Sequence, residues 1–302
     1  MACFHPVHGY RAPNGQIVSS PSRGWIDRPA SRRCGNCTGC RHDKSAEWAV
    51  RCVHESQSHK QNIFITLTYR PEDLPYPPSL DLKTFQDFNK KLRKHVFETS
   101  GQHIRFYHCG EYGSKSRRPH YHAIIFGYDF PDKRLHKVDK KTGEQLYTSE
   151  TLSKIWGLGF ASIGTVTFNS AAYVARYIVA KINGDLAADY YSWHDPITGE
   201  IFDLKPEYAT MSLKPGIARA WFDKYSTDVF PHDHVIIKGR KMRPPKYYDT
   251  LYERVHADAY RKLKTRRLAK IHKSAQDNTP ERLAVRKQVF LAKIKTLKRS
   301  LE

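Results

Sequence analysis

The middle of the chain carries apolar residues in two patterns, one typical of strands and one typical of helices. The run "NIFITLTY", residues 62–69, is short, β-branched and aromatic, which predicts a buried strand. Two further strand-like runs, residues 103–113 and 119–127, are joined by a short polar stretch and predict a hairpin. Between the first run and the hairpin, Asp81 can cap a helix. That helix has apolar residues at three- and four-residue spacing: Leu82, Phe85, Phe88, Leu92 and Val96.

The same alternation continues to about residue 230. "SETLSKIWG" predicts a short helix and "ASIGTVTF" a fourth strand, after which Asn169 or Ser170 is expected to cap a helix that runs to about Ile182. A fifth strand is expected near "EYATMS", and "VDKKTGEQLY" and "HDPITGEIF" predict two surface hairpins with Thr-Gly turns. This order predicts an α+β fold, with an antiparallel central sheet flanked by helices.

Composition divides the chain into three predicted segments. Residues 1–56 are rich in Cys, His and Arg, residues 57–230 hold the strand and helix pattern, and residues 231–302 form a basic helical extension. Within residues 255–302 there are 14 Lys or Arg against 4 Asp or Glu. Thr279 followed by Pro280 predicts a helix start. The apolar stripe of that helix comprises Leu283, Val289, Phe290, Ile294 and Leu297.

The charge of the chain narrows its class of partner. Its 302 residues include 51 Lys or Arg and 30 Asp or Glu, a net charge of +21, while 39% hydrophobic and 12% aromatic residues indicate a folded protein. Such a surplus favours a polyanion such as nucleic acid. No apolar run approaches the roughly 20 residues of a membrane span, and the first residues lack the apolar stretch of a secretory signal. We therefore expect an intracellular protein without a membrane partner.

Two histidines flank one tyrosine in "RRPHYHAIIFG". His120 and His122 would project from the same face of a strand, because residues two apart share a face. The partner strand of the hairpin offers Glu111, and two imidazoles with one carboxylate can hold a divalent metal and leave open positions for catalysis. The alternative is a pair of half-exposed histidines without a ligand, which is common for so short a motif.

"AAYVARYIVAKI" places Tyr173, Tyr177 and Lys181 along one stripe of a helix. Two aromatic residues at this spacing are often ordinary packing, but a lysine on the same stripe argues against a buried stripe. A phenol with a pKa of about 10 is a poor nucleophile until its phenolate is stabilised. A metal nearby can activate the electrophile instead, by polarising a phosphodiester oxygen. Lys181 would support the phenolate or the developing phosphate charge.

The cysteines suggest a second metal site. Cys34, Cys37 and Cys40 form two successive C-x₂-C steps, and Cys3 would complete a Cys₄ zinc site. His5, His8 and His42 are alternative fourth ligands, and an iron–sulfur cluster or free thiols remain open. Four protein ligands leave no open position, so we expect this Zn²⁺ to be structural. Two other cysteines, Cys52 and Cys109, are expected to be buried thiols.

Three segments together resemble a known group of enzymes. "FITLTY", "RPHYHAIIFG" and "YVARYIVAK" resemble the three ordered motifs of the HUH endonuclease superfamily, which includes the rolling-circle replication initiators. The paired tyrosines, with "MACFHP", "CGNCTGCR" and "EWAVRCVHE", are similar to the replication initiation proteins of gokushovirus-type microviruses, which are single-stranded DNA phages. The resemblance covers most of residues 1–255. It departs at Tyr121, where a bulky aliphatic residue is usual, and the position of Glu111 varies in the superfamily.

The resemblance implies a sequence-specific single-stranded DNA nickase with an HUH-type core. His120, His122 and Glu111 would hold Mg²⁺ or Mn²⁺. Tyr173 or Tyr177 would attack the scissile phosphate and become linked to the 5′ phosphate, leaving a 3′ hydroxyl for a host polymerase. The other tyrosine would cut the regenerated origin, so that the strand is rejoined. Implied partners are the single-stranded origin, a host DNA polymerase and a host helicase, in the cytoplasm of a bacterial cell.

Two other functions fit part of this pattern. One is a non-enzymatic single-stranded nucleic-acid-binding protein in which the histidines are incidental. The other is an HUH transposase, although transposases of this superfamily mostly carry one tyrosine. In each, the basic extension would track the DNA backbone. Aromatic residues that interleave with its charges are candidates for stacking on unpaired bases: Tyr247, Tyr248, Tyr252 and Tyr260.

Overall fold

The computed structural model describes residues 3–113, 116–140, 143–180 and 186–296. The chain divides into two compact units. The larger unit comprises Ser45–Tyr248, and the smaller unit combines both ends of the chain, Met1–Lys44 and Asp249–Glu302. The three segments expected from composition, with boundaries at residues 56 and 230, stay a prediction about independent folding domains.

A seven-stranded antiparallel sheet forms the centre of the larger unit, in the order β12-β5-β6-β4-β9-β8-β7. The predicted strands and the predicted hairpin are confirmed. The strands are β4 (Asn62–Tyr69), β5 (Arg105–Tyr112), β6 (Pro119–Phe126), β7 (Arg134–Val138), β8 (Gln145–Thr148), β9 (Gly159–Thr165) and β12 (Tyr208–Met211).

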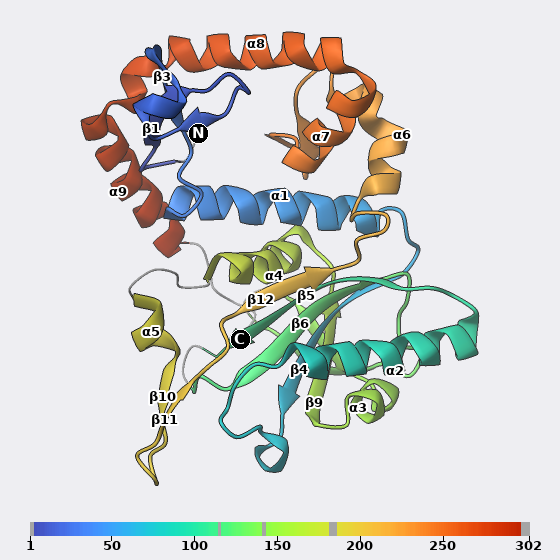
Figure 1. The fold of residues 1–302 in the computed structure, drawn as a ribbon. Coiled ribbons are helices and arrows are strands. Elements are labelled where there is room, and N and C mark those ends of the chain that lie inside the picture. The colour runs from blue at the N-terminus through green and yellow to red at the C-terminus, as the bar shows by residue number, and fades with distance from the viewer. Residues whose placement is uncertain (1–2, 114–115, 141–142, 181–185, 297–302) are drawn as a thin grey trace. The chain divides into compact units, whose positions relative to one another are not determined.

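Helices cover both faces of this sheet (Figure 1). α2 (Leu82–Ser100) and α3 (Glu150–Trp156) lie on one face, where Phe85, Leu92 and Trp156 join the core formed by alternate residues of β4, including Ile65 and Leu67. α4 (Phe168–Ala180) lies on the other face, facing the intervening residues of β4. Alternation along β4 therefore sends its side chains to two different layers.

Side-chain caps set the start of three helices. The carboxylate of Asp81 accepts a hydrogen bond from the Thr84 N–H, as predicted, and the Ser149 hydroxyl caps α3 in the same way. The prediction that Asn169 or Ser170 caps α4 was wrong. Thr167 precedes that helix, and its hydroxyl accepts from the Ser170 N–H at 3.0 Å while the Ser170 hydroxyl accepts from the Thr167 N–H at 2.7 Å. Ser170 is thus the second half of a capping box.

The expected end of α4 near Ile182 lies outside the described residues. The two predicted hairpins are present but differ in their neighbours. β7 and β8 extend the central sheet through the pairing of Tyr147 with Ile163, whereas β10 (Ser192–His194) and β11 (Ile201–Asp203) form a separate two-stranded ribbon. The larger unit also contains α5 (Leu186–Tyr191), α6 (Arg219–Val229), β13 (Val235–Ile237) and β14 (Arg240–Met242).

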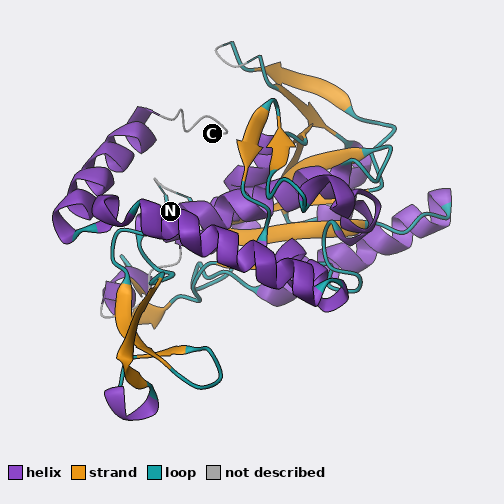
Figure 2. Ribbon diagram, turned by 90° about the horizontal axis from the view of Figure 1, so that it is seen from above, coloured by secondary structure: helices purple, strands orange, loops and turns teal. Residues whose placement is uncertain are grey.

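The smaller unit combines a three-stranded sheet with helices. Its strands are β1 (Val7–Arg11), β2 (Ile17–Val18) and β3 (Trp25–Arg32), and its helices are α8 (Ala257–Lys273) and α9 (Pro280–Thr296). α1 (Thr38–Ser56) and α7 (Lys246–Val255) each contribute residues to both units. The predicted start of α9 at Pro280 is confirmed. Long helices and strands occur together in the chain, as the predicted α+β class requires (Figure 2).

Burial corrects one further expectation. Tyr248 and Tyr260 are buried in their respective units, so they are not available to stack on bases. Cys52 and Cys109 are fully buried free thiols, as predicted. None of the helices in the described part of the chain is long and apolar enough to cross a membrane.

Candidate metal and tyrosine site

The β5–β6 hairpin brings the predicted ligands together. Its register pairs Glu111 directly with His120, and His122 lies two residues further along the same face of β6. The Nε2 atoms of His120 and His122 lie 2.5 and 2.8 Å from Oε1 of Glu111. The three ligand atoms lie within 4.8 Å of one another, a spacing that one metal ion can bridge.

Hydrogen bonds behind the two imidazoles determine which nitrogen faces the carboxylate. Nδ1 of His120 lies 3.2 Å from the carbonyl oxygen of Arg118. A carbonyl only accepts, so this Nδ1 carries a proton and donates it. Nδ1 of His122 lies 2.9 Å from the hydroxyl of Thr66, on the neighbouring strand β4. Such second-layer partners fix the orientation of metal-binding imidazoles and leave Nε2 for the metal.

The electrostatics of Glu111 also fit a cation. Burial raises the pKa of its carboxyl, but the hydrogen bonds and charges of His120 and His122 lower it more, so the net pKa lies below the usual range. The carboxylate is therefore ionised, and either a proton or a metal must lie between it and each Nε2 lone pair. Oε2 of Glu111 is buried and has no hydrogen-bond partner among the described residues. A hard cation such as Mg²⁺ or Mn²⁺ suits this oxygen.

α4 places one predicted nucleophile at this site. The hydroxyl of Tyr173 donates to Oε1 of Glu111 at 3.4 Å. Its ring contacts the imidazole of His122 edge-on, with centroids 5.1 Å apart, and packs against Phe64. These contacts leave the Tyr173 side chain buried. The capping box at Thr167 and Ser170 fixes the helix turn just before this tyrosine.

The other two members of the tyrosine stripe have no described side chains. Tyr177 lies on the backbone of α4, one helical turn after Tyr173, but its side chain is outside the description, and Lys181 lies outside the described residues. The roles predicted for Tyr177 and Lys181 therefore stay predictions.

The four predicted zinc ligands also converge, within the smaller unit. The sulfur atoms of Cys3, Cys34, Cys37 and Cys40 all lie within 4.8 Å of one another. This set reaches four sulfurs without His5, His8 or His42. All six cysteines, which are all among the described residues, are free thiols.

The surroundings of these sulfurs favour thiolates. Backbone N–H groups donate to three of them, for example from Phe4 to Cys37 Sγ at 3.4 Å and from Cys37 to Cys34 Sγ at 3.3 Å. Burial raises the pKa of the Cys37 thiol, but the N–H groups of Phe4 and Cys40 lower it, to about 6 overall. Four sulfurs, thiolate-stabilising N–H groups and a tetrahedral ion match a structural zinc site.

Two contacts of the histidine strand were missed by sequence reasoning. The hydroxyl of Thr66 behind His122 had a weak signal, because polar residues alternate with apolar ones in the run 62–69. The hydrogen bonds of Tyr121 to Asp81, 40 residues earlier, had none. A contact at that separation depends on how α2 packs against the sheet.

Fold and site thus define a class: an α+β protein in which a histidine–carboxylate group on a hairpin faces a helical tyrosine. A family model described as replication-associated protein ORF2 matches residues 62–182, which include all these residues. The chain is 32% identical over 284 residues to replication-associated protein VP4 of Bdellovibrio phage phiMH2K, spanning 90% of this chain and 85% of that one. No solved structure matches the chain significantly.

Two further relatives come from other phages. Replication-associated protein ORF2 of Spiroplasma virus 4 is 35% identical over 282 residues, spanning 86% of this chain and 83% of that one. Replication-associated protein ORF4 of Chlamydia phage 1 is 28% identical over 229 residues, spanning 74% and 53%. The chain belongs to this ORF2 family of microvirus replication-associated proteins.

Proposed function

We propose that this phage replication-associated protein is a metal-dependent, sequence-specific single-stranded DNA endonuclease that also rejoins strands during rolling-circle replication. The observation that carries the proposal is the convergence of Glu111, His120 and His122 with the Tyr173 hydroxyl at 3.4 Å from Glu111. Separately, each of these features is common. Together they supply a cation site and a nucleophile within reach of one phosphate.

The proposed reaction is a transfer of the phosphodiester from DNA to tyrosine. A divalent cation at Glu111, His120 and His122 would polarise a phosphate oxygen and offset the charge that builds on phosphorus. The Tyr173 oxygen attacks phosphorus, the Tyr–O–P bond forms and the P–O3′ bond breaks. The phenol proton has a carboxylate acceptor in Glu111, to which this hydroxyl already donates. The 3′ oxygen leaves as a hydroxyl after taking a proton from solvent.

Strand joining is the reverse transfer. A free 3′ hydroxyl attacks the phosphotyrosine, restores the phosphodiester and releases the phenol. In the proposal Tyr177, one turn later on α4, performs the second cleavage, and Lys181 balances the phosphate charge. The free 3′ hydroxyl between these steps primes a host DNA polymerase, with a host helicase supplying strand separation in the bacterial cytoplasm.

The proposal gives the smaller unit two supporting roles. Zn²⁺ held by the four cysteines would be structural, because a site with four protein ligands has no open position. The exposed Lys and Arg residues of α8 and α9 would bind the backbone of single-stranded DNA. Neither role places a residue of this unit in the chemical step.

The experiment that tests the proposal looks for a covalent adduct. The full chain is incubated with Mn²⁺ and single-stranded oligonucleotides that tile the phage genome, and the products are separated on a denaturing gel. We expect one oligonucleotide to give a denaturant-resistant protein–DNA band that disappears with EDTA or with the double substitution His120→Ala and His122→Ala. Oligonucleotides that are retained under native conditions but give no adduct would indicate the non-enzymatic binding protein instead.

A further inference from the structure

The residue between the two metal-binding histidines has its own set of contacts on the opposite face of the sheet. Tyr121 is fully buried, and its ring packs among aromatic side chains that include Phe85 and Trp156. A bulky aliphatic residue would fill the same space. What an aliphatic side chain lacks is the hydroxyl, so the contacts of that hydroxyl show what a tyrosine adds here.

The Tyr121 hydroxyl binds both backbone groups of a single residue. It donates to the carbonyl oxygen of Asp81 at 3.0 Å and accepts from the N–H of Asp81 at 3.2 Å. The hydroxyl of Tyr69, on the neighbouring strand β4, lies 3.0 Å away and completes its hydrogen bonds. Burial raises the pKa of Tyr121 far above its usual value, so the hydroxyl keeps the proton that it donates.

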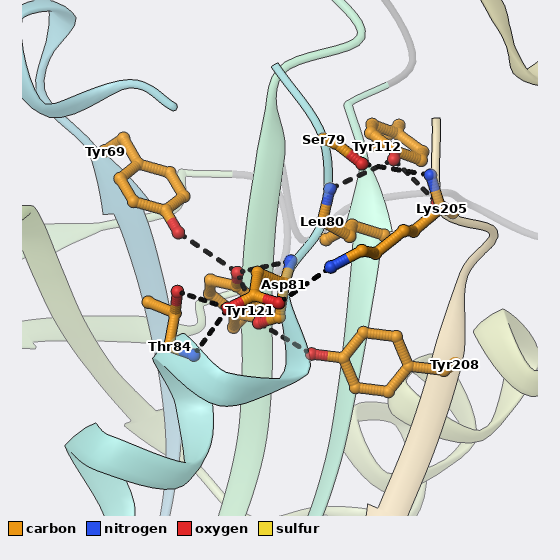
Figure 3. Close-up of polar contacts among 9 residues, drawn as sticks. All are labelled: Tyr69, Ser79, Leu80, Asp81, Thr84, Tyr112, Tyr121, Lys205 and Tyr208. Carbon is orange, nitrogen blue, oxygen red and sulfur yellow. Dashed lines mark hydrogen bonds and ion pairs between the residues drawn. The ribbon is translucent and has the colours of Figure 1, made fainter. Parts of the chain in front are cut away.

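Asp81 is itself held from several directions (Figure 3). Its carboxylate caps α2 by accepting from the Thr84 N–H at 3.2 Å, and it forms an ion pair with Lys205 at 2.9 Å. The hydroxyl of Tyr208, on β12, donates to its carbonyl oxygen at 3.3 Å. Because both its backbone groups and its side chain are engaged, Asp81 is a fixed point to which β6 is attached through Tyr121.

We propose that Tyr121 is a positioning residue for the metal site, because its hydroxyl bonds to Asp81 set where β6 holds His120 and His122 relative to Glu111. The inference rests on the proposed function for its cation. Successive side chains of a strand project to opposite faces, so anchoring Tyr121 on one face fixes the backbone that carries both imidazoles on the other. Thr66 orients one ring, whereas Tyr121 acts on the strand that carries both.

The test compares two tyrosine hydroxyls that reach the same carbonyl. Tyr121→Phe and Tyr208→Phe each remove one hydrogen bond to Asp81, but only β6 carries histidine ligands. The Kd for Mn²⁺ is measured on the full chain by following free Mn²⁺ with electron paramagnetic resonance, and binding that survives His120→Ala with His122→Ala is subtracted. We expect Tyr121→Phe to raise the Kd about tenfold, as loss of an outer partner of a metal ligand does. Tyr208→Phe should leave it within about twofold of the wild-type value.

An unchanged Kd in Tyr121→Phe would overturn the inference, and so would an equal rise in Tyr208→Phe, which would indicate general loosening. If Tyr121→Phe does not fold, as judged by circular dichroism, Tyr69→Phe takes its place. That variant removes only a donor to the Tyr121 hydroxyl, and it must raise the Kd more than Tyr208→Phe does. Adduct formation is assayed on the same samples. A wild-type protein that binds Mn²⁺ without forming an adduct contradicts the proposed function and leaves the positioning test intact.

Discussion

At the residue scale, the candidate site depends on groups that touch neither metal nor DNA. The proton on Nδ1 of His120 is assigned by the Arg118 carbonyl, and the ring of His122 is held by the Thr66 hydroxyl. Both arrangements turn Nε2 toward Glu111. Side chains one layer behind the ligands therefore decide whether the three ligand atoms present a usable set of lone pairs.

The contact of Thr66 gives a first prediction. Thr66→Val keeps the shape of the side chain but removes the oxygen bonded to His122, so the imidazole loses its fixed orientation. We expect the Mn²⁺ concentration for half-maximal adduct formation to rise about tenfold. Thr68→Val is the matched control, because this threonine lies on the same face of β4 but its hydroxyl donates to the carbonyl of Phe160. Equal effects of the two substitutions would contradict the assignment.

A second residue-scale prediction concerns pH. His54 is buried, bonded through Nδ1 to the Tyr248 hydroxyl at 2.8 Å and stacked on Trp221, and burial lowers its pKa from 6.5 to about 3. Between these values the unfolded chain binds the proton and the folded chain does not, so stability falls as pH falls. This group contributes a loss of about 1.4 kcal/mol in the free energy of unfolding per pH unit within that window.

The measurement is urea unfolding of the wild type and His54→Phe at several pH values from 7 down to about 4. Phe preserves the stacked ring and removes the titrating nitrogen. The pH dependence of the variant should be shallower over this range, whatever its stability at pH 7. Parallel pH profiles for the two proteins would show that His54 does not titrate as its burial requires.

At the element scale, sequence reasoning succeeded where a signal is local. The strand β4 and the cap of α2 at Asp81 follow from patterns within a few residues. The pairing of Glu111 with His120 follows from a hairpin, in which the turn fixes the register. The cap of α4 was misassigned because Thr167 and Ser170 are equally good caps, and only their reciprocal hydrogen bonds distinguish them.

Long-range pairings were not readable. The β7–β8 hairpin joins the sheet through Tyr147 and Ile163, and Tyr121 reaches Asp81 across the layer between β6 and α2. No periodicity encodes such contacts, because they depend on how complete elements pack. The candidate ligands and the tyrosine were found from residue type and spacing, whereas the groups that orient them were not.

The elements of the smaller unit give a third prediction, about the cysteine site. Phe290 of α9 packs against Phe4 and His42, which lie close in sequence to Cys3 and Cys40. A metal at the four sulfurs would therefore hold the surface on which α9 docks. We expect Cys34→Ser, or removal of Zn²⁺ by a chelator, to speed tryptic cleavage within α9 by about tenfold or more.

The control for this experiment is Cys52→Ser, which alters a buried thiol of the larger unit outside the cluster. Cleavage in α9 should be unaffected in that variant. Cys34→Ser that cleaves at the wild-type rate would contradict the view that a metal at the cysteines supports α9. Metal content measured on the purified wild-type chain identifies the ion.

At the scale of the whole molecule, the dominant feature is a net charge of +21. The exposed cations of α8 include three lysines, Lys262, Lys270 and Lys273. If they bind phosphates, replacing all three with Ala should weaken binding of single-stranded DNA at low salt. The slope of log K against log salt should become shallower by about 0.7 for each lysine–phosphate pair that the replacement removes.

The matched control for this fourth prediction is the same triple replacement on α2, at Lys83, Lys90 and Lys94. These lysines are also exposed but form ion pairs with carboxylates of their own helix. Their removal should change the slope little. Equal slopes for the two triple variants would mean that α8 has no special part in binding DNA.

The central claim is that a tyrosine of α4 becomes covalently linked to DNA at the histidine site. The most direct measurement is mass spectrometry of the DNA-linked peptide after the adduct is digested with protease and nuclease. The account predicts a nucleotide 5′-phosphate on Tyr173 or Tyr177, lost when both are replaced by Phe. Linkage to a residue elsewhere in the chain, or an adduct that survives the double replacement, would contradict it.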